Sequence, residues 1–233
     1  MSLWRPDPVL FPVRLPAAVA QDDASATQRA LAAAAAALEP AAWPRGTRLA
    51  GVLDAALSPT FIVPWHPRMR SRAERDAFAR HCAHEVYGEL AQGWTVCMDA
   101  APWGRAALAC AVDAGLHEGL RALTAERGWR LVSLQPRLVR AVNADRRSVA
   151  GDSFWFVLPE PPALTLLLVR ERQPERVKRV AGTVADIDRV LAREAFALGL
   201  AGHSLPVVLH RPDGPALPVP HLPARAPAPA RAA

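Results

Sequence analysis

Residues 106–134 read AALACAVDAGLHEGLRALTAERGWRLVSL, and this stretch decides the fold class. It begins with an apolar run, 106–112, that has the length of a buried strand. Leucines then recur at helical spacing over residues 116–123, and a glycine ends that pattern. Residues 129–134 form a second strand-like run. A strand, a helix and a strand in this order predict an α/β protein with a parallel, right-handed crossover.

Strand and helix signals continue upstream of this stretch. Runs at 49–53 and 60–63 predict two strands that pair through a turn at 55–59. Ser71, followed three residues later by Glu74, forms a capping-box pattern and predicts a helix that ends at Tyr87. Three further elements are expected: an edge strand or extended arm at 9–15, an alanine-rich helix at 24–39 and a strand at 94–98.

Downstream, the pattern predicts an antiparallel meander followed by a helix. Apolar runs at 154–158 and 163–169 flank a proline-rich turn, and residues 176–180 alternate like a half-exposed third strand. A strand at 206–209 closes this part, and the Pro/Ala/Arg-rich tail at 212–233 is expected to be extended or disordered. The helix, expected at 184–200, should carry one apolar stripe formed by Ile187, Val190, Leu191 and Phe196.

Composition excludes several classes of protein. No window of the 233 residues approaches the roughly 18 apolar residues of a membrane-spanning helix, and residues 1–8 lack the features of a secretion signal. The three cysteines, Cys82, Cys97 and Cys110, are embedded in apolar sequence and are expected to be free thiols. We therefore expect a cytoplasmic protein. The net charge of +6 is scattered, which argues only weakly for nucleic acid.

Catalytic motifs are missing from the sequence. There is no Gly-x-Ser-x-Gly elbow, no Gly-x-Gly-x-x-Gly loop and no Walker loop. His81, Cys82, His84 and Glu85 could bind zinc, but their spacing misses the zincin pattern, so ordinary helix residues are favoured. We expect no enzyme activity, no metal and no cofactor.

Tryptophans and arginines are the candidate binding residues. Trp65 and Trp103 stand at proline turns, where each ring either closes a core or anchors a partner protein. Arg68, Arg70 and Arg72 surround a predicted helix start, where they either meet an acidic partner or form a solvated surface. These five residues are the predicted partner-binding set.

Two stretches together resemble a known family. The first is LSPTFIVPW at 57–65, which leads to a helix closing with Tyr87-Gly88, and the second runs from CAVD at 110–113 through LVSLQP at 131–136 to Asn143. They resemble the cytoplasmic actin-like domains of bacterial type II secretion protein L and type IV pilus assembly protein M. In that family a strand ending in Pro-Trp precedes a helix, and a later strand, helix and strand lead to a proline and an asparagine.

The resemblance implies a reduced actin-like ATPase fold with two ribonuclease-H-like halves. It also implies a scaffold that binds other proteins of a secretion or pilus machine; a homodimer is left open. No membrane segment follows these stretches, unlike in full-length protein L, which favours a soluble relative resembling protein M, or a diverged paralogue. The expected organisation is an arm and alanine-rich helix at 1–48, a first half at 49–150, a smaller second half at 151–211 and the tail at 212–233.

The turn at 159–162 argues against nucleotide binding. Actin-like ATPases cradle phosphate on glycine-rich hairpins that also carry an aspartate, whereas this turn reads Pro-Glu-Pro-Pro, and proline has no N–H to donate. An adaptor that has lost nucleotide turnover is therefore the leading hypothesis. A nucleotide (ATP)-binding actin-like protein and a basic nucleic-acid-binding module are the alternatives.

Overall fold

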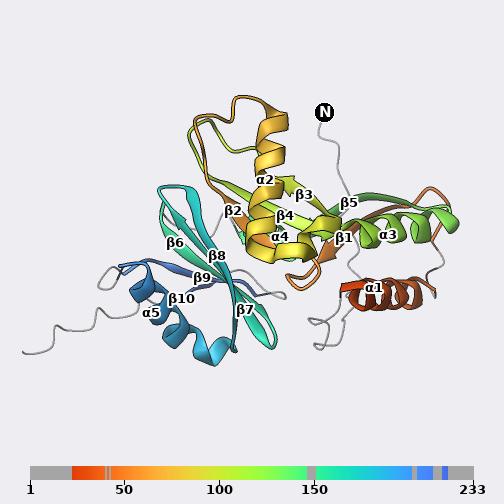
Figure 1. Ribbon diagram of the computed structural model, residues 1–233. Coiled ribbons are helices and arrows are strands. Elements are labelled where there is room, and N and C mark those ends of the chain that lie inside the picture. The colour runs from red at the N-terminus through yellow and green to blue at the C-terminus, as the bar shows by residue number, and fades with distance from the viewer. Residues whose placement is uncertain are drawn as a thin grey trace, which may run out of the picture. The chain divides into compact units, whose positions relative to one another are not determined.

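The computed structural model describes residues 23–39, 41, 43–145, 151–200, 204–211 and 217–219. The chain divides into two compact units, Met1–Arg140 and Ala141–Ala233, and each is described by itself (Figure 1). Helices and strands alternate along the chain, which confirms the predicted α/β class. The strand predicted at 9–15 lies outside the described residues.

The first unit contains every helix and strand predicted for residues 24–134, but two predicted strand pairings are wrong. β1 pairs in parallel with β5, not with β2, and β4 pairs with β2 and β3, not with β5. Gly51 helps to explain the first difference: a Cβ there would lie 2.6 Å from Leu134 Cδ1, so the bare backbone of β1 makes room for β5. The elements are α1 (Asp23–Leu38), β1 (Arg48–Leu53), β2 (Thr60–Val63), α2 (Arg72–Tyr87), the 3-10 helix η2 (Gly88–Gly93), β3 (Trp94–Met98), β4 (Ala107–Asp113), α3 (Ala114–Glu126) and β5 (Arg130–Pro136).

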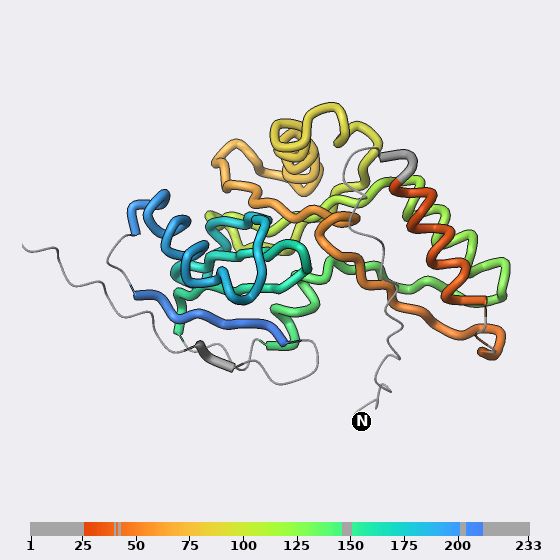
Figure 2. Tube along the Cα trace, turned by 90° about the horizontal axis from the view of Figure 1, so that it is seen from below, coloured from red at the N-terminus to blue at the C-terminus, as the bar shows by residue number. Residues whose placement is uncertain are grey.

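Two helix contacts organise this unit. α2 lies on one face of the β2-β4-β3 sheet through Ala79 and Ala83, whose small side chains allow close approach. α1 runs beside α3, as Figure 2 shows, and Leu31 of α1 fills the space where Gly119 lacks a Cβ. Thr27 Oγ1 donates to Oδ1 of Asp113 at 3.0 Å, and the same oxygen caps α3. The alanine-rich α1 is therefore a close-packing helix.

The second unit is built on a five-stranded sheet in the order β10-β9-β6-β7-β8. The predicted meander is confirmed, because β6, β7 and β8 pair antiparallel in sequence. β10 corrects part of the tail prediction, since Leu217–Val219 pairs with β9; the rest of the tail lies outside the described residues. The elements are α4 (Arg137–Asp145, unpredicted, which enters this unit), β6 (Phe154–Glu160), β7 (Ala163–Arg170), β8 (Gln173–Ala181), η3 (Val184–Asp186), α5 (Ile187–Ala197), β9 (Val207–Leu209) and β10.

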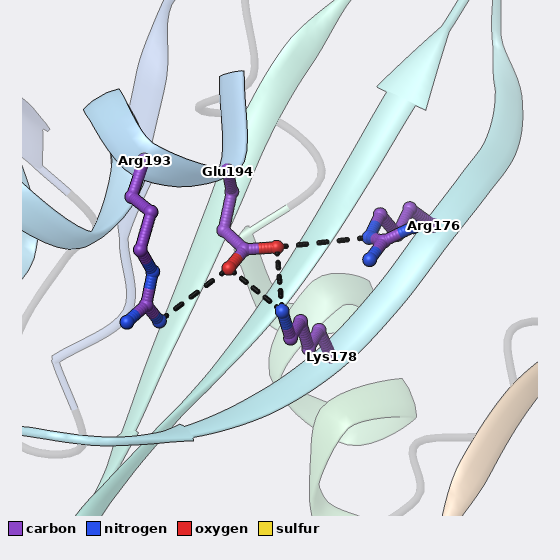
Figure 3. A network of polar contacts seen from close by, with 4 residues as sticks. All are labelled: Arg176, Lys178, Arg193 and Glu194. Atoms are coloured by element: carbon purple, nitrogen blue, oxygen red, sulfur yellow. Dashed lines mark hydrogen bonds and ion pairs between the residues drawn. The ribbon is translucent and has the colours of Figure 1, made fainter. Parts of the chain in front are cut away.

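The buried stripe of α5 differs from the prediction at one position. Phe196 is 76% exposed, because it lies nine residues beyond Ile187 and therefore points about half a turn away from it around the helix. Glu194, seven residues beyond Ile187, takes the buried place instead and is 2% exposed. Its carboxylate accepts from Lys178 Nζ at 2.8 and 3.0 Å and pairs with two arginines (Figure 3). These cations offset the cost of burying its charge.

Candidate partner-binding surface

Two connecting segments leave the three-stranded sheet at the same end of its strands. β2 and β3 lie on either side of β4, and both run antiparallel to it. The last residue of β2 opposes Ala107, and the last residue of β3 opposes Ala109. The β2–α2 connection, 64–71, and the β3–β4 connection, 99–106, therefore start close together beside the beginning of β4.

The structure brings Trp65 and Trp103, one from each connection, into contact. Their ring centroids are 5.7 Å apart and their planes meet at 77°, an edge-to-face arrangement of a kind that contributes about 0.5–1.5 kcal/mol. Trp65 is 36% exposed and Trp103 is 63% exposed. Trp129 and Trp155, in contrast, are buried. Trp129 and Trp155 therefore belong to the core, whereas the rings of Trp65 and Trp103 are accessible from solvent.

Met69 supports the connection that carries Trp65. It is 7% exposed, and its backbone N–H donates to the carbonyl of His66 at 3.0 Å. Trp65, Met69, Arg75 and Arg105 contribute to the lining of a hollow of about 10 Å³. Small-molecule sites enclose about 300–1,000 Å³, so this hollow is far smaller than such a site.

A capping box holds the start of α2 next to this pair. Ser71 Oγ accepts from the backbone N–H of Glu74 at 3.1 Å, and Glu74 Oε2 accepts from the N–H groups of Ser71 and Arg70 at 2.8 and 2.7 Å. The hydrogen bond from the backbone N–H of Ser71 has the largest effect in lowering the pKa of Glu74, and the hydrogen bond from the backbone N–H of Arg70 lowers it as well. The carboxylate is thus already satisfied by backbone N–H groups.

The predicted arginines lie on the same connection and on the first turn of α2. Arg68, Arg70 and Arg72 are all exposed, and Arg72 Nε makes a loose pair with Asp76 at 3.8 Å. Arg75 Nη2 donates to the carbonyl of Ala101 at 3.4 Å and so joins α2 to the β3–β4 connection. We call Trp65, Trp103, Arg68, Arg70 and Arg72 the tryptophan surface.

The tryptophan surface is set in a basic neighbourhood. Residues 64–76 and 99–106 carry five arginines and three carboxylates. Sequence reasoning missed Met69, which lies on the same connection as Trp65, and Arg105, which lines the same hollow because β2 and β3 flank β4. Met69 gave no local signal in the sequence, since a single methionine in a polar connection forms no periodic apolar pattern.

The other sequence candidates form ordinary structure. His81 stacks near Phe78 at 6.1 Å on α2, and no group of three metal-ligating side chains occurs within the described ranges. The proline-rich turn joins β6 to β7, and Glu160 is 5% exposed, with Oε2 accepting from Thr165 Oγ1 at 2.5 Å. That carboxylate therefore faces a neighbouring strand and not an open phosphate site.

Comparison with known proteins gives structural likeness only. No family model and no curated protein sequence matches the chain. Among solved structures, it is similar to a PilM-PilN type IV pilus biogenesis complex (15% identity, 73% of this chain, 53% of that chain, TM-score 0.47). It is also similar to a Bacteroides thetaiotaomicron protein with an actin-like ATPase fold (6% identity, 74% of this chain, 63% of that chain, TM-score 0.46). A third similar structure is the cytoplasmic domain of EpsL from the Vibrio cholerae type II secretion system (12% identity, 71% of this chain, 60% of that chain, TM-score 0.44).

The chain spans between 53% and 63% of the length of these three solved chains. In the part of the chain that the structure describes, none of the helices is both long and apolar enough to cross a bilayer. Both kinds of protein named by the sequence resemblance, the pilus component and the secretion component, are among the structures to which this chain is similar.

Proposed function

We propose that this chain is a non-catalytic, cytoplasmic scaffold that binds partner proteins of a bacterial secretion or type IV pilus machine through the tryptophan surface. The observation that carries the proposal is the exposed contact between Trp65 and Trp103. Exposed tryptophans flanked by arginines have the composition of interface hot spots. The choice of machine rests on the resemblance of the two stretches at 57–88 and 110–143 to the actin-like domains described above.

The chemistry of the β6–β7 hairpin supports the non-catalytic part of the proposal. Its turn consists of Pro161 and Pro162, which have no N–H with which to hold phosphate. Glu160, the acidic residue beside the turn, is buried and engaged by Thr165. A hydrated metal ion needs an accessible carboxylate, so the hairpin lacks both parts of a nucleotide clamp.

The binding experiment uses the cytoplasmic parts of pilus or secretion proteins encoded near this chain's gene. Trp103→Ala should weaken binding of the true partner by about 30-fold or more, since a hot-spot truncation costs at least about 2 kcal/mol. Phe196→Ala is the matched control, because Phe196 is also an exposed aromatic residue but lies in the other unit. Equal affinity of wild type and Trp103→Ala would contradict the proposal.

A melting experiment tests the non-catalytic part separately. We expect no rise in melting temperature when ATP and magnesium are added at millimolar concentration. A ligand at about 100 times its dissociation constant stabilises by about 2.7 kcal/mol. A clear rise would overturn this part and favour the nucleotide-binding alternative.

A further inference from the structure

Two cysteines that the proposed function does not use face each other across the β3–β4 pair. Cys97 of β3 and Cys110 of β4 are direct partners in the antiparallel register. Residues that oppose each other in this way project their side chains to the same face of the sheet. The N–H of Asp99, two residues further along, donates to the carbonyl of Leu108, so Cys97 and Cys110 occupy a hydrogen-bonded position of the ladder. The Cα atoms of such pairs are about 5.5 Å apart, within the 4.4–6.8 Å range of disulfide-bonded cysteines.

These thiols lie on the face of the sheet that α2 does not cover. The α2 face is formed by the alternate residues of the same strands, such as Val96 and Ala111. Cys97 and Cys110 instead line a cavity of about 340 Å³, together with residues of β5 and with His117 and Arg121 of α3. Cys97 is exposed and Cys110 is half-buried. A small oxidant in solution can therefore reach Cys97 first.

The electrostatics of the pair agree with this order of reaction. Burial and, to a smaller extent, the nearby charge of Cys97 raise the pKa of Cys110 to about 11, although a hydrogen bond from the Cys97 backbone lowers it. Two thiolates side by side are thus disfavoured.

We propose that Cys97 and Cys110 are a redox-active dithiol that forms a reversible disulfide across β3 and β4 by exchange with a small-molecule disulfide. The Cys97 thiolate attacks one sulfur of the oxidant, and one reduced thiol leaves with the proton. The Cys110 thiolate then attacks Cys97 Sγ in the mixed disulfide, and the second reduced thiol leaves with its proton. The protein loses two hydrogen atoms, and the oxidant is reduced to two thiols.

The position of the bond gives it a structural consequence. It would cross-link the hairpin just before its connection, 99–106, which carries Trp103. A cross-link restricts the conformations open to the residues it encloses. Any effect on partner binding rests on the proposed function, whereas formation of the bond does not.

The test uses the full chain with oxidised glutathione, followed by alkylation and intact mass measurement. We expect wild type to lose the mass of two hydrogen atoms, to retain one alkylated cysteine, Cys82, and to yield a peptide that links Cys97 to Cys110. Dithiothreitol should restore three alkylated cysteines. Cys82→Ser is the matched control and should form the same bond.

Cys110→Ser separates the two steps. This variant should stop at the mixed disulfide and gain the mass of one glutathione on Cys97. The adduct would also show that Cys97 remains accessible in the variant. The proposal is overturned if wild type also stops at the glutathione adduct, if it reacts only as a disulfide-linked dimer, or if Cys82 reacts in preference to Cys97. None of these readouts depends on a partner protein, so they stand apart from the test of the tryptophan surface.

Discussion

Among the residues of the first unit that the structure describes, two pairs of tryptophans touch, and the pairs differ in what surrounds them. Trp43 and Trp129 have ring centroids 5.1 Å apart, and Trp65 and Trp103 have centroids 5.7 Å apart. Trp129 is 5% exposed, and its Nε1 donates to the backbone carbonyl of Trp43 at 3.2 Å. Trp103 is 63% exposed. The ring separations are similar, although the planes meet at 52° in the first pair and at 77° in the second. Burial and hydrogen bonding therefore distinguish the structural pair from the exposed one.

The comparison predicts that the two pairs contribute very differently to stability. Trp129→Ala should lower the free energy of unfolding by about 3–5 kcal/mol, because it leaves a cavity where a large ring was buried. Urea denaturation followed by circular dichroism measures the change. A loss below about 1 kcal/mol would show that burial of Trp129 does not hold the first unit together.

A milder change at the same site isolates the hydrogen bond. Trp129→Phe keeps an aromatic ring but removes Nε1–H, so the carbonyl of Trp43 loses this donor. We expect a loss of about 1–2 kcal/mol from the hydrogen bond and the reduced volume. The same denaturation experiment, with Trp129→Ala for scale, checks it. A loss as large as that of Trp129→Ala would mean that the ring's volume contributes little.

The exposed pair should be nearly neutral for stability. Trp103→Ala should change the free energy of unfolding by about 1 kcal/mol or less, since the main loss is the edge-to-face contact with Trp65. Trp65→Ala and the double variant complete a cycle that measures the coupling of the rings. A loss of 3 kcal/mol or more would show that Trp103 closes a core, and would remove the basis of the proposed binding role.

The smallest expected effect concerns the cation beside the buried ring of Trp129. Arg127 Cζ lies 5.9 Å from the centroid of the Trp129 ring. Arg127→Met keeps an apolar stem and should cost about 0.5–1 kcal/mol. Arg127→Lys, which retains the charge, is the control and should cost less. Equal losses in the two variants would assign the effect to the hydrogen bond that Arg127 makes to the Leu123 carbonyl.

Local signals account for most of the elements that the sequence predicted. The capping box at Ser71 and Glu74 places the start of α2, and Gly88, with φ of +62°, follows its last residue. The helix α4 was missed because its end runs into a polar segment from Asn143 onwards that carries no stop signal. Phe196 was wrongly assigned to the buried stripe because its apolar character was considered without its angular position around the helix.

The amino-acid sequence alone determined most of the segments that become helices and strands, α4 and β10 being exceptions, because periodicity, caps and prolines act within a few residues of one another. It also located Trp65 and Trp103 at turns. Only the tertiary structure decided that β1 lies beside β5, that the two exposed rings meet and that Cys97 opposes Cys110. These contacts join residues far apart in the chain, and they depend on strand order, register and close approaches such as that at Gly51, which a local pattern does not encode.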